Sequence, residues 1–148
     1  MNNKLLLRIA SGLMAFHTLG HTIGALTWNQ APNAAIGRVI TAMETNYFNF
    51  MGRNTTIASF YNGYGIILIF VLLLLTIMLW LLSGEAENRL SVKLLLPLTV
   101  YLIIQAIGEF IYFFPFAAVI SFLAGVAVLL AWLAARKTIN QKSLIKAG

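Results

Sequence analysis

Cysteine is absent from the 148 residues, and acidic side chains are scarce. Without cysteine the chain can form no disulfide, no thiolate nucleophile, no cysteine-ligated zinc site and no iron–sulfur cluster. Charged residues make up only 9% of the sequence, against about 25% in soluble globular domains. Hydrophobic residues make up 60%, which is more apolar surface than a soluble fold of this length can hide from water. These proportions favour a single-domain integral membrane protein.

Basic side chains outnumber acidic ones by ten to four, which gives a formal net charge of +6. In a soluble protein such a charge would suggest nucleic acid as a partner. Here the basic residues lie mostly at the ends of apolar runs, where they orient spans and contact anionic headgroups. We therefore expect membrane lipids as partners and no nucleic acid, and no residue pattern points to a particular oligomeric state.

Four apolar stretches are long enough to cross a bilayer, which takes about 20 residues in a helix. We expect these spans over residues 5–28, 56–83, 90–114 and 116–135. Pro115 separates the last two, because proline lacks the amide hydrogen that a continuing helix requires. The predicted fold class is therefore all-α, an integral membrane four-helix bundle that forms one transmembrane domain over residues 1–148.

The orientation of the spans is predicted from the distribution of lysine and arginine. With both termini inside, eight basic residues would be cytoplasmic: Lys4, Arg8, Arg89, Lys93, Arg136, Lys137, Lys142 and Lys146. Only Arg38 and Arg53 would lie outside. This bias follows the positive-inside rule, so we expect a multi-pass protein of a bacterial inner membrane with both termini cytoplasmic.

The connector between the first two spans, residues 29–55, is longer than most loops and is therefore expected to carry structure. Apolar side chains recur in it at helical spacing: Ile36, Val39, Ile40, Met43 and Tyr47. Pro32 and Asn33 are suitable residues to start such a helix. We expect an extra amphipathic helix on the outer membrane surface, which serves either as a packed connector or as a lid.

Polar side chains inside the spans are informative, because an unpartnered polar group in lipid is costly. His17 and His21 are four residues apart and share a helix face. Glu109 is the one acidic residue inside any predicted span. Counting from the outer span ends puts His21, Asn62 and Glu109 at similar depths of about 8 to 10 Å, with His17 and Gln105 one turn deeper.

We expect His21 and Glu109 to form the acid–base pair of a pocket in the outer half of the bundle, because imidazole and a perturbed carboxyl can titrate near neutral pH. Six further residues are candidates for ligand binding: His17, Asn62, Gln105, Tyr112, Tyr61 and Arg53. The expected ligand is a small, hydrophobic, lipid-like molecule, since ionisable groups within membranes commonly mark functional sites. The alternative is a structural or accessory subunit in which the His–Glu cluster only fixes helix packing.

A metal site is the third interpretation of the two histidines and the glutamate. Their His-x-x-x-His spacing is that of helical zinc ligands, but Glu does not follow the first histidine as it does in zinc proteases. Two histidines on one helix face also cannot occupy opposite axial positions of a single haem. We therefore assign no metal and no cofactor.

Four motifs together resemble a group of small bacterial four-span membrane proteins without an assigned activity. They are Phe16-His17-Thr18-Leu19-Gly20-His21, Met51-Gly52-Arg53, Ser59-Phe60-Tyr61-Asn62-Gly63-Tyr64-Gly65 and Glu109-Phe110-Ile111-Tyr112-Phe113. The plan is also similar to two broader four-helix membrane families, the DoxX-like family and the EXPERA family of sterol isomerases and sigma-2-type receptors. EXPERA enzymes move a proton at a sterol double bond with several intramembrane acids and a histidine. This chain has a single such acid, so the resemblance assigns no catalytic residue.

Overall fold

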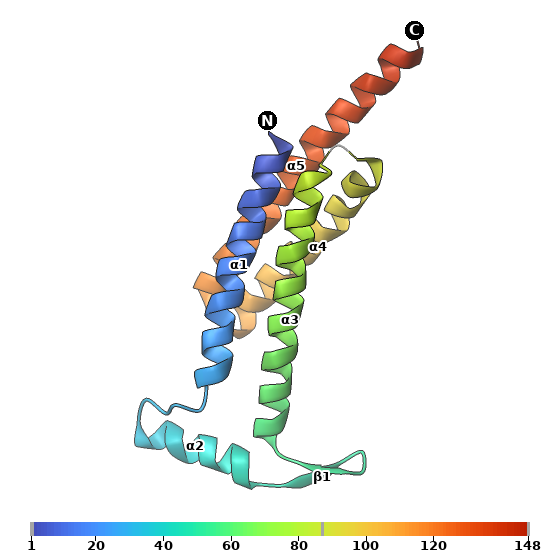
Figure 1. The fold of residues 1–148 in the computed structure, drawn as a ribbon. Coiled ribbons are helices and arrows are strands. Elements are labelled where there is room, and N and C mark those ends of the chain that lie inside the picture. Colours follow the sequence, from blue (N-terminus) through green and yellow to red (C-terminus); the bar gives the residue numbers. More distant parts are fainter. Residues whose placement is uncertain (1, 87, 148) are drawn as a thin grey trace. The chain divides into compact units, whose positions relative to one another are not determined.

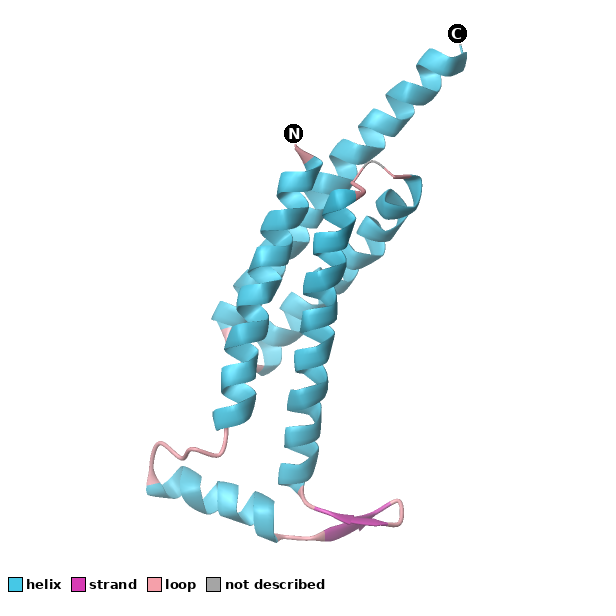
Figure 2. Ribbon diagram, in the orientation of Figure 1, coloured by secondary structure: helices cyan, strands magenta, loops and turns pink. Residues whose placement is uncertain are grey.

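The computed structural model describes residues 2–86 and 88–147, without the side chains of 139, 140 and 142–147. In this part of the chain five helices alternate with short connections and one small hairpin (Figure 1). The elements are α1 (Asn3–Thr27), α2 (Ala34–Thr45), β1 (Phe48–Phe50), β2 (Arg53–Thr55), α3 (Ile57–Gly84), α4 (Arg89–Tyr112) and α5 (Pro115–Ala147). The chain is thus predominantly helical, as predicted (Figure 2). Lys142 and Lys146, which the orientation prediction uses, lie outside the described side chains.

Three helices are long and apolar enough to cross a membrane: α3, α4 and the segment Pro115–Thr138 of α5. Helices of this kind indicate a membrane protein. Helix α1 has a sufficient length of 25 residues but is not one of the three. Its two histidines and several small polar residues lower its mean hydropathy. Length and composition alone therefore do not identify α1 as a span.

The helix bounds agree with the predicted spans at most ends. Helix α3 and helix α4 begin and end within two residues of the predicted limits. Pro115 is the first residue of α5, a position where its missing amide hydrogen is harmless. Helix α5 continues to Ala147, well beyond the predicted span end at residue 135. A span ends where its apolar residues end, but the helix continues because no proline or glycine interrupts it before Gly148.

The connector contains the predicted helix, together with a hairpin that was not predicted. Asn33 caps α2, and its side-chain oxygen accepts a hydrogen bond from the Ile36 amide at 3.0 Å. The hairpin pairs β1 with β2 through the two-residue turn Met51-Gly52. Both turn residues have positive φ, 51° and 85°, as a type I′ turn requires. Only Gly52 signals this turn, which is why the sequence pattern did not reveal it.

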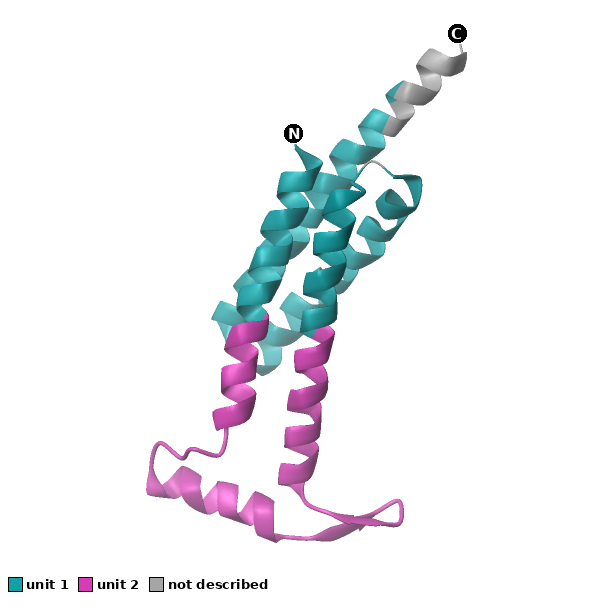
Figure 3. Ribbon diagram, in the orientation of Figure 1, with its two compact units in different colours: residues 1–17, 72–148 teal, residues 18–71 magenta. Residues whose placement is uncertain are grey.

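The chain divides into two compact units, and each is described by itself (Figure 3). The first unit comprises residues 1–17 and 72–148, and the second comprises residues 18–71. In the second unit, the Phe48 and Phe50 rings of the hairpin pack on Phe60 of α3, with ring centroids 6.1 and 5.3 Å apart. The Cα of Gly65 lies in the same unit, where a Cβ would come within 3.3 Å of the Ala25 Cβ.

The first unit packs segments of α1, α3, α4 and α5 around fully buried side chains. These are Leu7, Met14, Leu72, Leu79, Leu95, Leu102, Val128, Ser83 and Ser121. The Ser11 hydroxyl of α1 donates a hydrogen bond to the Thr76 carbonyl of α3 at 2.8 Å. Helices α4 and α5 approach closely at Gly125, where an added Cβ would lie 3.0 Å from Ile103 Cδ1 and 3.3 Å from Leu102 Cβ.

Replacing Gly125 with valine should destabilise the protein, because the side chain enters the α4–α5 contact. Overpacking of this kind typically lowers the free energy of unfolding by about 1 to 3 kcal/mol. Gly12→Val is the matched control, because a Cβ there meets no atom within 4 Å. Reversible unfolding in mixed detergent micelles measures both variants. Equal losses of stability in the two would show that the close approach at Gly125 is wrong.

Candidate functional site

The imidazole of His17 lies between two other helices of the first unit. Its Nδ1 is 3.1 Å from Ser121 Oγ on α5, and its Nε2 is 3.4 Å from Glu109 Oε1 on α4. The three residues are only 7%, 0% and 8% exposed, respectively. A buried carboxylate and imidazole in contact stabilise each other's charged or polar forms, because water is not there to do so.

Gln105 completes this group, which we call the buried polar cluster (His17, Gln105, Glu109 and Ser121). Its Nε2 donates to Glu109 Oε1 at 2.7 Å and approaches Ser121 Oγ at 3.4 Å. Gln105 and Glu109 are one helical turn apart on α4, so their side chains lie along one face. The cluster therefore joins α1, α4 and α5 through polar contacts.

One arrangement of protons is consistent with the contacts between His17, Ser121, Gln105 and Glu109 given above. With His17 protonated on Nε2, that nitrogen faces Glu109 Oε1 and Nδ1 accepts from the Ser121 hydroxyl. The Ser121 oxygen then accepts from Gln105 Nε2. Ser121 thus links the amide of Gln105 to the imidazole of His17 through two hydrogen bonds.

Two oxygen atoms of the cluster are buried without a hydrogen-bond partner among the described residues. They are Gln105 Oε1 and Glu109 Oε2. Leaving a buried acceptor unsatisfied costs about 1 to 3 kcal/mol, and more for a charged group. The Gln105 oxygen is an acceptor, and so is Glu109 Oε2 in the carboxylate form, which a bound molecule that donates hydrogen bonds would complement.

An apolar hollow of about 280 Å³ opens between α4 and α5 at the level of the cluster. It is lined by Ala106, Ile107, Phe110, Ala118, Val119 and Phe122. Ala106 precedes Glu109 by three residues, and Ala118 precedes Ser121 by three, so small side chains flank the cluster on both helices. The lining of the hollow contains no residue of the cluster itself, and its apolar walls suit the hydrocarbon part of a small molecule.

Three other predicted site residues make contacts within the second unit. His21 Nε2 donates to the Gly65 carbonyl of α3 at 3.0 Å. Asn62 Oδ1 accepts from the indole nitrogen of Trp28 at 2.6 Å, and the Tyr61 ring packs on Trp28 at 4.8 Å between centroids. These contacts hold α1 and α3 together, and they pair His21 with a backbone oxygen. The participation of His21 in acid–base chemistry stays a prediction.

The last two predicted residues are exposed. Arg53 lies on β2, opposite Phe50 in the hairpin. Tyr112 is the final residue of α4 and is 80% exposed. The structure therefore brings together His17, Gln105 and Glu109 of the predicted set.

Ser121 is the cluster member that the sequence reasoning did not select. It is the serine of α5 that lies in the middle of an apolar run, between Ile120 and Phe122. A single hydroxyl there is a weak signal, because serine can also bond to its own helix backbone. Its partner on another helix is visible only in the tertiary structure.

No group of three or more His, Cys, Asp or Glu side chains suited to a metal ion occurs in the part of the chain that the structure describes. The buried polar cluster contains two such side chains, His17 and Glu109. A structural zinc site usually takes four protein ligands and a catalytic one three. The residues present therefore do not form a zinc site by themselves.

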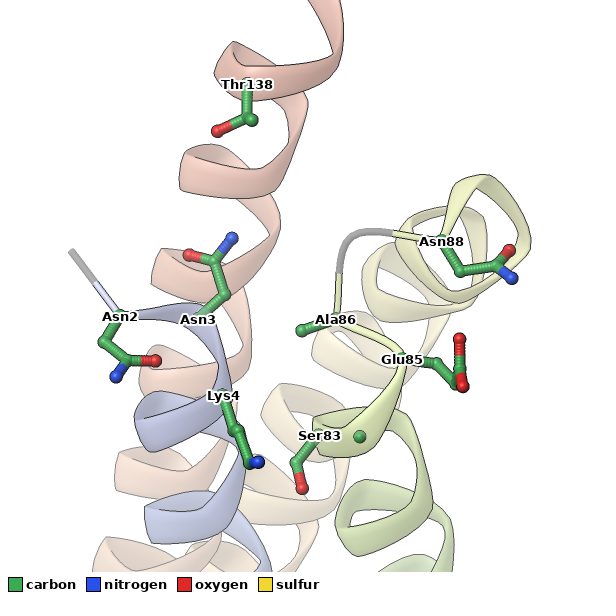
Figure 4. A pocket seen from close by; sticks show the side chains of 9 residues that line it. Asn2, Asn3, Lys4, Ser83, Glu85, Ala86, Asn88 and Thr138 are labelled. Carbon is green, nitrogen blue, oxygen red and sulfur yellow. The ribbon is translucent and has the colours of Figure 1, made fainter.

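A second hollow, of about 390 Å³, lies at one end of the first unit (Figure 4). It is polar, and residues from three helix ends or their flanks line it, together with Thr138 from within α5: Asn2, Asn3, Lys4, Ser83, Gly84, Glu85, Ala86, Asn88 and Thr138. The start of α1, the end of α3, the start of α4 and a late turn of α5 therefore lie at the same end of this unit.

Comparison of the chain with protein-family models, with curated proteins and with solved structures finds no match. The functional interpretation therefore depends on the geometry of the cluster.

Ser121→Ala should lower stability, because it leaves His17 Nδ1 and Gln105 Nε2 without this shared partner. We expect a loss of about 1 to 2 kcal/mol in the free energy of unfolding. Ser83→Ala is the matched control: its hydroxyl is equally buried but bonds to the Trp80 carbonyl of its own helix. The control should lose less than about 0.5 kcal/mol. Equal losses in the free energy of unfolding of the two variants would show that the hydrogen bonds between Ser121 and the other helices do not stabilise the protein.

Proposed function

We propose that the chain is a four-span protein of a bacterial inner membrane whose buried polar cluster binds the polar head of a small lipid-like molecule. The observation that carries this proposal is the pair of unsatisfied acceptors, Gln105 Oε1 and Glu109 Oε2, beside the His17 imidazole. A protein that buries a carboxylate and leaves one of its oxygens unpaired gains free energy when a donor arrives.

The burial pattern of α1 supports its assignment as the fourth span. Six of its large apolar side chains are exposed in a stripe at helical spacing: Leu5, Ile9, Phe16, Leu19, Ile23 and Leu26. Its polar residues Ser11, His17 and Thr18 are buried. In water this arrangement would be inverted, whereas in lipid it puts apolar groups against acyl chains. At about 1.5 Å per residue, α1 is long enough for a hydrocarbon core of about 30 Å.

The helix ends that line the polar hollow support cytoplasmic termini. Lys4, Arg8, Arg89, Lys93, Arg136 and Lys137 all occur near these ends. Arg8 stacks on Trp80 at 4.8 Å and Arg136 on Trp132 at 5.3 Å, and tryptophan prefers the membrane interface. Basic residues gathered at one end of the spans are typical of the cytoplasmic side, and the tryptophans mark this end as a membrane interface.

This topology is testable by cysteine labelling, because the chain contains no native cysteine. Asn2→Cys places a thiol directly before α1, and Tyr47→Cys places one in the connector between α1 and α3, after α2; both positions are exposed. With a membrane-impermeant maleimide on intact cells, we expect Tyr47→Cys to react and Asn2→Cys to react only after permeabilisation. Glu85→Cys, in the loop after α3, should behave like Asn2→Cys. Labelling of Asn2→Cys and Tyr47→Cys from the same side would exclude α1 as a span.

The chemistry of the cluster selects the class of ligand. Because the unsatisfied atoms are acceptors, the head of the ligand must donate hydrogen bonds, as a hydroxyl or an amine does. Its apolar part would occupy the hollow between α4 and α5, where Phe110 and Phe122 supply aromatic walls. An apolar molecule with one or two donor groups, entering from the surrounding lipid, meets both requirements.

The His17–Glu109 contact also suits acid–base chemistry on such a ligand. Glu109 Oε2 is the atom that would take a proton from a carbon atom of the ligand and return it to another, and the His17 imidazole lies 3.4 Å from Oε1 of the same carboxyl group. Movement of a double bond, which needs one proton removed and one returned, is the simplest reaction that this pair supports. His17 takes the role that the sequence analysis assigned to His21.

A structural role is the second candidate, and the internal hydrogen bonds of the cluster favour it. Side chains of three helices satisfy one another through the contacts of His17, Ser121 and Gln105. Polar contacts of this kind stabilise helix association in membranes. An accessory subunit would need the cluster for packing alone, and its removal would then change stability and nothing else.

Glu109→Gln separates the two functions, because it keeps the shape of the side chain while a donor replaces one carboxylate oxygen. We expect the variant to fold and to bind its ligand about 10- to 100-fold more weakly, as the loss of a charge-assisted hydrogen bond predicts. The measurement is native mass spectrometry of protein extracted with membrane lipid, which detects a retained small molecule.

Val119→Trp is the second variant in this experiment, since it fills the hollow from an exposed position without touching the cluster. It should also lose the ligand, whereas Thr99→Val, which replaces a hydroxyl bonded to its own helix, should retain it. Unchanged ligand retention in Glu109→Gln and Val119→Trp, with lower stability in Glu109→Gln, would instead establish the structural role.

A further inference from the structure

A cleft of about 290 Å³ lies between α4 and α5, apart from the buried polar cluster. It is lined by Arg89, Val92 and Lys93 of the first turns of α4, and by Trp132 and Arg136 of α5. Three of its five lining residues are cationic and none is acidic. Like charges repel one another in a shared cleft, so this arrangement favours a bound anion.

The three cationic side chains are arranged by the two helices on which they lie. Arg89 and Lys93 are four residues apart and lie on one face of α4. Arg136 is held against the Trp132 ring at 5.3 Å, which orients its guanidinium group. The start of α4, capped by Asn88, adds the positive end of a helix dipole to the same place. Among the described residues, none of these three cations has a carboxylate within ion-pair distance.

We propose that this basic cleft binds the phosphate of an anionic phospholipid. Guanidinium groups match the oxygens of a phosphodiester, and lysine adds a further charge. The proposal rests on the membrane-spanning part of the proposed function but not on the His17–Glu109 site.

The surface below the cleft identifies a lipid rather than a soluble phosphate as the source. One turn further along each helix, the faces of the cleft continue with Leu96 on α4 and Leu129 on α5. Leu96 is 42% exposed, and Leu129 is partly exposed. The two helices then close on each other at Gly125. An anionic head at the open, basic end and an acyl chain along these leucines match this change from charged to apolar surface.

Removing two of the three charges should abolish selective lipid retention. We expect Arg89→Gln with Lys93→Gln to bind phosphatidylglycerol about 10- to 30-fold more weakly than the unmodified protein, since each basic residue near an anionic surface contributes about one order of magnitude or less. Arg136→Lys keeps the charge but loses the planar, stacked group, and should weaken binding by about threefold to tenfold. Native mass spectrometry of nanodiscs with phosphatidylcholine and a minority of phosphatidylglycerol counts the bound lipid.

The matched control is Lys4→Gln with Lys137→Gln, which changes the net charge equally at exposed sites outside the cleft. It should retain phosphatidylglycerol at the unmodified level. Glycerol phosphate added to the nanodiscs should not displace the lipid. The proposal is overturned if the control loses as much lipid as the cleft variant, or if glycerol phosphate competes effectively. Glu109→Gln should leave the number of bound phosphatidylglycerol molecules unchanged. A failure of the proposal for the basic cleft is therefore distinguishable from a failure of the proposal for the buried polar cluster.

Discussion

The contact between Glu109 and His17 is the constraint on which the first unit depends. A carboxyl group in a long apolar helix must be neutral or must find a partner, because desolvation of an isolated charge is too costly. The structure supplies that partner from a different helix, at 3.4 Å, and adds a glutamine amide one turn away on α4. Satisfying this one side chain therefore sets the facing surfaces of α1 and α4, and Ser121 extends the same requirement to α5.

The packing around the cluster follows from the same requirement. Polar contacts across helices need short separations, and small residues allow helices to approach closely. Many of the buried residues of α5 are accordingly alanines, and a Cβ added at Gly125 would lie only 3.3 Å from Leu102 Cβ and 3.0 Å from Ile103 Cδ1. The phenylalanines near the cluster point outward instead: Phe110, Phe116 and Phe122 are all more than half exposed. Buried polar and small residues together with exposed aromatic rings are suited to lipid and not to water.

The first unit thus places different chemistry at different levels. Its buried polar cluster offers hydrogen-bond acceptors, which suit a neutral ligand with donor groups. Its basic cleft offers only donors and positive charge, which suit an anion. Both sites use α4 and α5, but in turns that are far apart along these helices. No residue therefore belongs to both sites.

The sequence by itself determined the helices, because apolar run length, Pro115 and the cap at Asn33 act locally to set where a helix begins and ends. It also determined that Glu109, Gln105 and His17 needed partners, since polar groups in apolar runs are costly wherever they lie. Which histidine meets Glu109 was decided only by the tertiary structure. His17 and His21 share one helix face, so the face alone does not distinguish them. Counting residues from the span ends gives depth only for helices that are parallel and end at the same level, and helix stagger and crossing angle change that depth. For the same reason the bond from Ser121 to His17, and the contacts of Asn62 and His21 with Trp28 and Gly65, depend on how helices pack and not on the order of residues along them.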